Sequence, residues 1–270
     1  MKLKLFFLAT ILLAFTSCSS SNDEIETEKE QELGNITKLS SYFPFSYATT
    51  ELSDPNYYFE YDAQNRVIKK NGMKMRITEG GFDRYFISNK VYTQVTYNGN
   101  FITTSNHSSG PGTGFVPLQK KVFELDSKGK IKKCVVFLDE NIVERELIYQ
   151  YQLDKLVAIV TEFPKYNYPN KNVNRFTYYS DGNLKSVKTV TMQNNVDIYI
   201  QQEVQFSNYD KAPNPLKKLY IFDEYIHSSL SKNNYQKIVT LKYIDNKLVS
   251  QDESSWFNQY NADGTIKLFY

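Results

Sequence analysis

The sequence has few of the residues that most often build metal and catalytic sites. It contains two histidines in 270 residues, His107 and His227, and neither has a partner at metal-ligand spacing. HExxH, CxxC and acidic calcium-loop motifs are absent, and the glycine-rich run at 108–114 lacks the Gly-Lys-Ser/Thr ending of a phosphate-binding loop. We therefore predict no metal site, no cofactor and no catalytic residue, and we expect both histidines to lie in loops or at the surface.

The chain also lacks an apolar run of membrane-spanning length. The N-terminal run from Leu5 to Phe15 holds 11 residues, whereas a helix needs about 20 to cross a bilayer. Lysines precede this run, and two small residues follow it before Cys18. This arrangement is typical of a signal peptide, which we predict to comprise residues 1–17.

The residues Phe15-Thr16-Ser17-Cys18 resemble the lipobox of bacterial lipoproteins. That resemblance implies that the Cys18 thiol receives a diacylglycerol and that its amino group is acylated after cleavage. Two or more acyl chains hold a protein stably at a membrane, at roughly 0.8 kcal/mol per buried methylene. The alternative is an ordinary signal peptide followed by an unrelated cysteine. On the lipobox interpretation, the membrane is a partner that the chain reaches through its N-terminal lipid.

Residues 18–34 are predicted to form the lipidated cysteine and a flexible acidic tether. The segment Ser19–Glu32 carries six acidic residues and one lysine, with almost no apolar side chain to drive folding. In lipoproteins of the Bacteroidota, such an acidic run resembles a signal for delivery to the outer face of the outer membrane. A solvated spacer without export meaning fits the same residues. The predicted location is therefore the outer membrane, either at the cell surface or on the periplasmic face.

Neither charge nor cysteine content indicates nucleic acid binding or a disulfide framework. Loss of Lys2 and Lys4 with the signal peptide reduces the basic residues from 32 to 30, which equals the number of acidic residues. Without a basic stripe to neutralise phosphates, nucleic acid is not an expected partner. Cys134 is the one cysteine left after lipidation of Cys18, and its apolar neighbours predict a small buried strand residue.

Residues 35–270 are predicted to form one all-β domain built from an internal repeat. Helical periodicity is nearly absent, and no proline- or glycine-rich linker divides the segment. Each unit is an alternating run, a polar turn and a second run opened by an aliphatic or aromatic residue. The units begin at Tyr57, Val95, Val122, Leu147, Phe176, Val204, Val239 and Phe257. Their second arms open at Val67, Phe101, Ile131, Leu156, Leu184, Leu216, Leu248 and Ile266.

Each unit is expected to fold as a β-hairpin. Tip residues such as Asp126 and Gly129 supply the side-chain hydrogen bonds and the positive φ that tight turns need. In the first arm, Tyr57, Phe59 and Tyr61 would share one half-buried face. Because a single hairpin is marginal in water, about eight of them are expected to pair side by side and bury their common face.

The expected fold is therefore an antiparallel meander that forms a large curved sheet, a half-barrel or a barrel. Second arms such as Ile131-Lys132-Lys133 carry lysines on both faces. A membrane-spanning barrel keeps one face apolar, so this pattern favours a soluble scaffold held at the membrane by its lipid.

The residues of the first turn carry a resemblance to a known repeat. Tyr61-Asp62-Ala63-Gln64-Asn65-Arg66-Val67 resembles a degenerate tyrosine-aspartate (RHS-like) repeat. The chain from residue 40 to 270, including the Asn-Pro-containing run at 209–215, resembles uncharacterised Bacteroidota lipoproteins with a porin-like fold. This resemblance implies a structural repeat and brings no catalytic residues with it.

Aromatic residues outside the hairpin arms are the candidates for binding. Tyr166 and Tyr168 lie in a loop between two units, and Trp256 is the single tryptophan. Exposed rings beside amides can stack on sugars or peptides, although rings in a tyrosine-rich β protein also serve packing. Three functions remain open: a non-catalytic envelope module that binds glycan, peptide or protein, a structural or assembly subunit of an envelope complex, and a hydrolytic enzyme. We predict the first.

Overall fold

The computed structural model describes residues 34–41, 43, 55–79, 82–109, 119–139, 142–166 and 168–269. All of them belong to one unit, Leu33–Tyr270. The predicted signal peptide, Cys18 and the tether as far as residue 33 lie outside the described residues.

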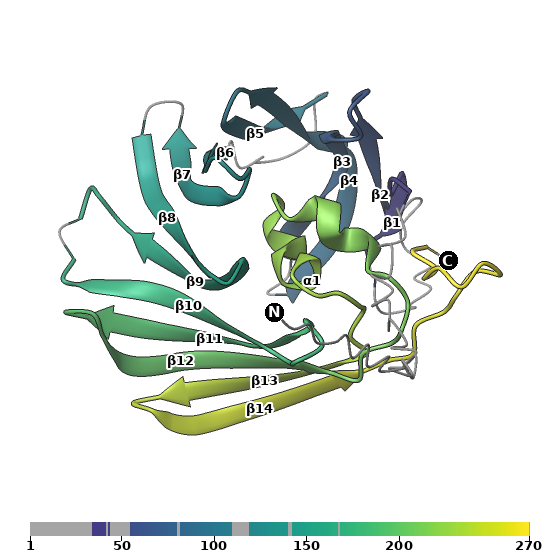
Figure 1. Cartoon of the computed structure of the whole chain (residues 1–270). Coiled ribbons are helices and arrows are strands. Elements are labelled where there is room, and N and C mark those ends of the chain that lie inside the picture. The colour runs from purple at the N-terminus through teal and green to yellow at the C-terminus, as the bar shows by residue number, and fades with distance from the viewer. Residues whose placement is uncertain are drawn as a thin grey trace, which may run out of the picture. The chain divides into compact units, whose positions relative to one another are not determined.

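A single antiparallel sheet of 14 strands follows the order of the chain, and it curves strongly in Figure 1. The strands are β1 (Lys38–Ser40), β2 (Asn56–Tyr61), β3 (Val67–Glu79), β4 (Phe82–Asn98), β5 (Phe101–Ser108), β6 (Lys120–Leu125), β7 (Ile131–Asp139), β8 (Ile142–Gln152), β9 (Lys155–Glu162), β10 (Asn170–Tyr178), β11 (Leu184–Gln193), β12 (Val196–Ser207), β13 (Lys237–Ile244) and β14 (Lys247–Ser255). Within the described residues, β1 and β14 do not pair with each other. The predicted all-β meander is therefore confirmed, in the form of an open curved sheet.

The turns at 62–66, 126–130 and 179–183 share one five-residue geometry. In the second of them, Asp126 N donates to Lys130 O at 2.8 Å, and Asp126 Oδ1 accepts from Lys130 N at 2.9 Å. The fourth residue of each turn has a positive φ: Asn65 (57°), Gly129 (78°) and Gly182 (92°). The predicted use of Asp, Asn and Gly at the tips is confirmed, because these residues bond their own backbone and tolerate the left-handed region.

A β-bulge follows the same turns. On β10 and β11, Tyr178 pairs with Leu184, but the next pair is Thr177 with Ser186, so one residue is left over. The same shift follows the turns before β3, β7 and β9. A bulge of this kind re-aims the side chains beside it. The residues that open these second arms all face the core and are buried: Val67, Ile131, Leu156 and Leu184.

The sixth predicted hairpin does not form, and its second arm is replaced by short helices. Residues 208–236, which we call the plug, contain η1 (Pro215–Leu219), η2 (Asp223–Tyr225) and α1 (Ile226–Ser229), and they lie inside the curve of the sheet (Figure 1). Asn214 caps η1 by accepting from Leu216 N at 2.9 Å. Pro215 at the first position has no N–H to lose and favours a helical start. The prediction of a strand opening at Leu216 is therefore wrong.

The eighth predicted unit is reduced to one turn with an isolated bridge between Tyr260 and Ile266. The C-terminal tail then reaches the first edge of the sheet, where Ser40 N donates to Leu268 O at 2.8 Å. This contact gives the short strand β1 a further backbone partner.

The plug and the concave face of the sheet form the core together. One cluster packs Leu219 and Phe222 of the plug against Phe59 and Val95, and a second packs Leu184 and Phe206 against plug side chains. Each fully buried side chain of this size contributes roughly 1.5 to 3 kcal/mol. The predicted common face of Tyr57, Phe59 and Tyr61 is confirmed, since all three lie in or against the first cluster.

A smaller apolar cluster lies on the opposite face of the sheet. Val173 and Phe176 are three positions apart on β10, so they point to opposite faces. Phe176 faces the plug, whereas Val173 packs with Ala158, Val160 and Val190. No helix among the described residues has the length and apolar character needed to cross a membrane.

Candidate functional site

The two ends of the curved sheet carry different segments. In an antiparallel meander, connections after odd-numbered strands lie at one end and those after even-numbered strands at the other. We call the first end the loop rim; its described members include residues 163–166, 168 and 169 and the turns 194–195 and 245–246. The second end, the plug rim, includes the turns 62–66, 126–130 and 179–183, both ends of the plug and the residues after Ser255.

The predicted binding residues Tyr166 and Tyr168 lie together at the loop rim. Their rings stack with centroids 5.3 Å apart and planes 20° apart, and the Phe163 ring meets Tyr168 edge-on at 6.3 Å. Tyr166 is 50% exposed and Tyr168 is 60% exposed. Both rings therefore form a small aromatic surface that solvent reaches.

Backbone and ionic contacts hold this aromatic loop. Tyr166 N donates to Phe163 O at 2.9 Å, and Tyr168 N donates to Tyr166 O at 2.7 Å. At the base of the loop, Lys171 Nζ bonds Glu162 Oε1 at 2.5 Å. A ring pair held in this way loses little conformational freedom when a ligand binds.

The third predicted binding residue, Trp256, lies at the plug rim and is not brought together with the tyrosines. Its ring contacts Tyr235 of the plug at 5.7 Å between centroids, and its Nε1 donates to Asn258 Oδ1 at 3.1 Å. Nearby, Asp210 accepts from Asn258 Nδ2 at 3.0 Å and from Tyr260 OH at 2.9 Å. Trp256 thus belongs to a network that fastens the C-terminal tail to the stem of the plug.

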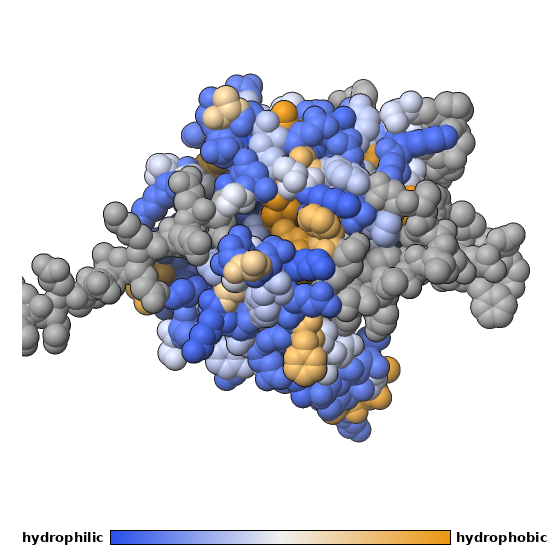
Figure 2. All heavy atoms as spheres, turned by 90° about the vertical axis from the view of Figure 1, so that its right-hand side faces the viewer, coloured by the Kyte–Doolittle hydropathy of each residue, from blue (hydrophilic) through white to orange (hydrophobic). Residues whose placement is uncertain are grey.

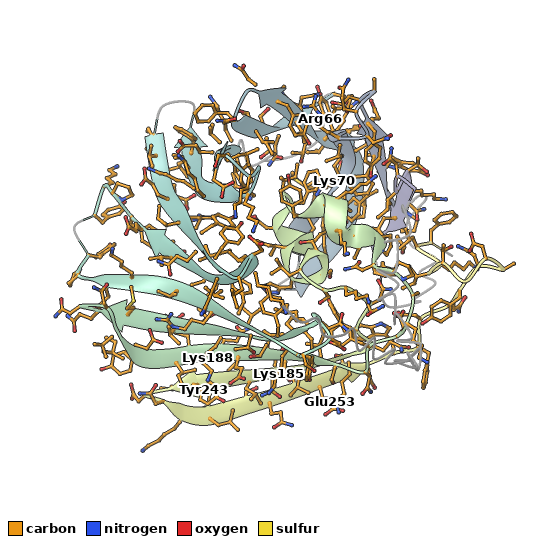
Figure 3. The ribbon with its side chains drawn as sticks, viewed as in Figure 1. Arg66, Lys70, Lys185, Lys188, Tyr243 and Glu253 are labelled. Carbon is orange, nitrogen blue, oxygen red and sulfur yellow. The ribbon has the colours of Figure 1, made fainter. Side chains whose placement is uncertain are left out.

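Two buried lysines of the sheet hold the middle of the plug. Lys121 Nζ on β6 bonds Asp223 Oδ2 at 2.5 Å, and Lys70 on β3, labelled in Figure 3, forms an ion pair with Glu224. The Lys70 ammonium also lies 5.0 Å from the centroid of the Phe222 ring. Because Asp223 and Glu224 are adjacent in η2, the two ion pairs fix the position of η2 relative to β3 and β6.

A pocket of about 180 Å³ lies beside the plug. Its walls are formed by Phe43, Asn214, Leu216, Glu224, Tyr225, Ser228, Asn233, Asn234 and Tyr235. Asn214 is only 1% exposed, and its amide is committed to the carbonyls of Ser228 and Ser231 at 2.6 and 3.0 Å. Figure 2, which faces the side of the C-terminal tail, shows hydrophobic atoms at the base of a hollow with a hydrophilic rim.

Tyr225 stands out among the side chains around this pocket. It is 8% exposed, and its hydroxyl has no hydrogen-bond partner among the described residues. Burial raises the pKa of this hydroxyl well above its ordinary value, so it keeps its proton. A buried hydroxyl without a partner costs roughly 1 to 3 kcal/mol.

The titratable side chains that the sequence singled out do not converge. His107 lies at the end of β5, and its Nε2 is 2.8 Å from Ser105 Oγ. Burial raises the pKa of the Cys134 thiol to about 12 and keeps it unreactive, which confirms the predicted buried strand residue. The described residues contain no group of three or more His, Cys, Asp or Glu side chains that could hold a metal ion.

His227, expected in a loop or at the surface, lies in a helix and is only partly exposed. This residue lies in α1, with its ring against Phe176 and Phe206 at 6.3 and 5.8 Å between centroids. Burial lowers the pKa of its imidazole to about 4. His227 therefore packs as a neutral, partly buried ring against the core, where α1 brings it.

The pocket was not predicted, because its walls come from a segment interpreted as a hairpin. The run Ala212-Pro213-Asn214-Pro215 and the pair Asn233-Asn234 were the available signals. Prolines cannot donate to a sheet and asparagines favour turns and caps, so both runs argued against strands at 212–215 and 233–234.

No family model and no curated protein matches this chain. Among solved structures, a porin-like protein from Bacteroides vulgatus ATCC 8482 is similar at a TM-score of 0.51 and 17% identity, over 86% of this chain and 90% of that chain. A porin-like protein from Bacteroides uniformis ATCC 8492 is similar at a TM-score of 0.46 and 13% identity, over 78% and 79% of the two chains. The first likeness confirms the porin-like fold that the sequence resemblance implied.

Proposed function

We propose that this chain is a non-catalytic binding module of the bacterial cell envelope. A lipid on Cys18 holds it at the outer membrane, the acidic segment that follows acts as a spacer, and the loop rim presents Tyr166 and Tyr168 to a glycan, peptide or protein. The observation that carries the proposal is the stacked, half-exposed tyrosine pair on a loop that hydrogen bonds and an ion pair hold in place.

The chemistry of this surface suits stacking. Large amphipathic rings give contact area at low entropic cost, and tyrosine also offers a hydroxyl for hydrogen bonding. Lys165 adds a cation 6.0 Å from the centroid of the Tyr166 ring. A sugar ring or a peptide segment could therefore find an apolar face and polar groups together.

Binding assays with the purified mature domain test the proposal. Envelope and dietary glycans are screened on an array, and the double variant Tyr166→Ala/Tyr168→Ala is compared with Tyr199→Ala, which removes a similarly exposed ring from β12. The double variant should lose about tenfold or more in affinity for a captured glycan, and Tyr199→Ala should lose none. Equal affinities for all three proteins would refute binding through these rings.

The lipid attachment has its own test. The Cys18→Ala variant should leave the membrane fraction and appear in the soluble fraction of the envelope. Partition equal to that of the unaltered protein would refute lipidation at this cysteine.

An assembly function is the second candidate, because one sheet edge is open. Among the described strands, β14 pairs on one side with β13 and has no partner on the other. Ile244, Leu248 and Val249 are exposed next to this edge. Unpaired edges readily accept an added strand. A partner that docks at this edge should be cross-linked through a cysteine placed at Ser250. A cysteine placed in the 126–130 turn should give no cross-link.

A further inference from the structure

We infer that the pocket beside the plug binds one small, neutral, polyhydroxylated molecule, such as a single sugar ring. This site is separate from the tyrosine pair, because its described walls come from the plug and Phe43 and include neither Tyr166 nor Tyr168. It therefore goes beyond the proposed function and can be tested without it.

Two polar groups in the pocket wall have hydrogen-bonding capacity that the fold leaves unused. Asn234 Nδ2 donates to Asp210 and to Ala212 O at 3.2 Å, whereas no described residue donates to Asn234 Oδ1. Ser228 Oγ and Tyr235 OH share one hydrogen bond of 2.8 Å, so one of their two protons remains available. The Tyr225 hydroxyl is not part of this set, because solvent does not reach it from the pocket. Polar groups that the fold leaves unpaired beside a pocket are available to bind a ligand.

The unpaired groups have different hydrogen-bonding roles. Asn234 Oδ1 can only accept, and the spare proton of the Ser228–Tyr235 pair can only be donated to an acceptor. A molecule that satisfies both must itself donate and accept. Alcohol groups do so, whereas ethers, carboxylates and ammonium groups do not.

Charge favours a neutral ligand. Among the described residues of the pocket wall, Glu224 is the one ionisable acid or base apart from the two tyrosines, and it is paired with Lys70. An anionic ligand would face the Glu224 carboxylate, and a cationic one would compete with a buried lysine for it. A neutral molecule avoids both the repulsion from Glu224 and the loss of the Lys70–Glu224 ion pair.

The shape and size of the pocket favour a single ring. Phe43, Leu216 and the rings of Tyr225 and Tyr235 provide apolar walls beside the polar groups, the combination that ligand pockets usually show. The volume of about 180 Å³ is below the roughly 300–1,000 Å³ of pockets for drug-sized ligands. One ring fits this space better than an oligosaccharide.

Ligand-detected NMR tests the inference on the whole mature domain. The probes are the methyl glycosides of glucose, galactose, mannose and N-acetylglucosamine at millimolar concentration, with glucuronate and glucosamine as charged counterparts. At least one neutral glycoside should show saturation transfer and raise the Tm of the protein, and its charged counterpart should bind at least tenfold more weakly. If no neutral glycoside binds, or if the charged forms bind equally well, the inference is wrong.

Variants place the binding in this pocket. Ser228→Leu fills it and should abolish binding, while Ser254→Leu on exposed β14 should leave binding unchanged. Tyr235→Phe keeps the ring and removes the hydroxyl, so it should weaken binding about tenfold, and Tyr243→Phe is its control. Circular dichroism checks that each variant is folded. A ligand whose affinity survives both Ser228→Leu and Tyr235→Phe binds elsewhere, which would overturn the assignment.

Discussion

The hairpins β10–β11 and β13–β14 have the same bulge, but the paired residues beside it point to opposite faces of the sheet. In the first, Tyr178 pairs with Leu184, and both side chains lie against or in the core cluster of Phe206. In the second, Tyr243 pairs with Leu248 in the same way. Leu184 is 0% exposed, whereas Leu248 is 52% exposed.

The register of β13 on β12 explains this difference. Phe206 pairs with Ile238 and both pack in the core beneath the plug. Tyr243 lies five positions after Ile238 on an unbroken strand, so it points to the other face. A shift of one residue exchanges the faces of a strand. The comparison teaches that a hairpin's own sequence sets its turn and bulge, whereas its neighbour and the plug decide which face is buried.

The largest predicted effect contrasts the two leucines. Leu184→Ala should lower the free energy of unfolding by about 4 kcal/mol, because it leaves a cavity in a closely packed core. Leu248→Ala should cost less than about 0.5 kcal/mol, since its side chain is half exposed. Urea unfolding followed by circular dichroism measures both. Similar costs at the two positions would contradict the assignment of faces.

The second effect is a loss of stability at acid pH that arises from His227 in the plug. The His227 pKa of about 4 lies below its ordinary value of 6.5 because burial disfavours the charged ring. The unfolded chain therefore binds a proton before the folded one does, and stability present above pH 6.5 falls as the pH drops toward 4. The loss reaches up to about 3 kcal/mol. The His227→Phe variant, measured by urea titrations between these pH values, should lack this slope; an unchanged slope would assign it to other groups.

The third effect compares an ion pair at the plug with one in the β13–β14 hairpin. Lys70 is buried and pairs with Glu224, whereas Lys237 and Glu253 pair at 2.6 Å on a more exposed surface. Lys70→Met should cost about 1 to 2 kcal/mol, because the partly exposed Glu224 loses its partner. Lys237→Met should cost about 0 to 1 kcal/mol. Thermal unfolding at low and high salt measures both, and an equal cost would mean that the plug is not held by its lysines.

The smallest effect tests the turns that both kinds of hairpin need. Gly129 has a φ of 78° with open space around its α-carbon, so Gly129→Ala should cost about 1 kcal/mol through backbone strain alone. Gly129→Asn should cost less, since Asn65 already takes this conformation at the matching place in the first turn. Equal Tm values for both variants would show that conformation at this position does not limit stability.

Much of the sheet could be predicted because its signals are local. Asp126 and Gly129 make their hydrogen bonds within one turn, and the alternation of Tyr57, Phe59 and Tyr61 follows from the pleat alone. The run Pro213-Asn214-Pro215 carried an equally local signal against a strand. The regular repeat around it favoured a hairpin, and the plug was missed.

The candidate sites could be predicted only in part. Tyr166 and Tyr168 are close in sequence and are also close in space. Trp256 is remote from them, and the topology places it at the other rim against Tyr235. The packing of His227 could not be predicted, because Phe176 and Phe206, whose rings contact it, lie far from it in the sequence.

By itself, the sequence determined most of the strands, the turn chemistry and the meander order, since each depends on residues within about one hairpin of each other. The tertiary structure alone decided that residues 208–236 fill the curve of the sheet, that Lys70 and Lys121 meet Glu224 and Asp223, and that Asn234, Ser228 and Tyr235 surround a pocket. The physical reason is that burial and ion pairing depend on distance in space, and the folded chain brings together residues as far apart in sequence as Ser40 and Leu268.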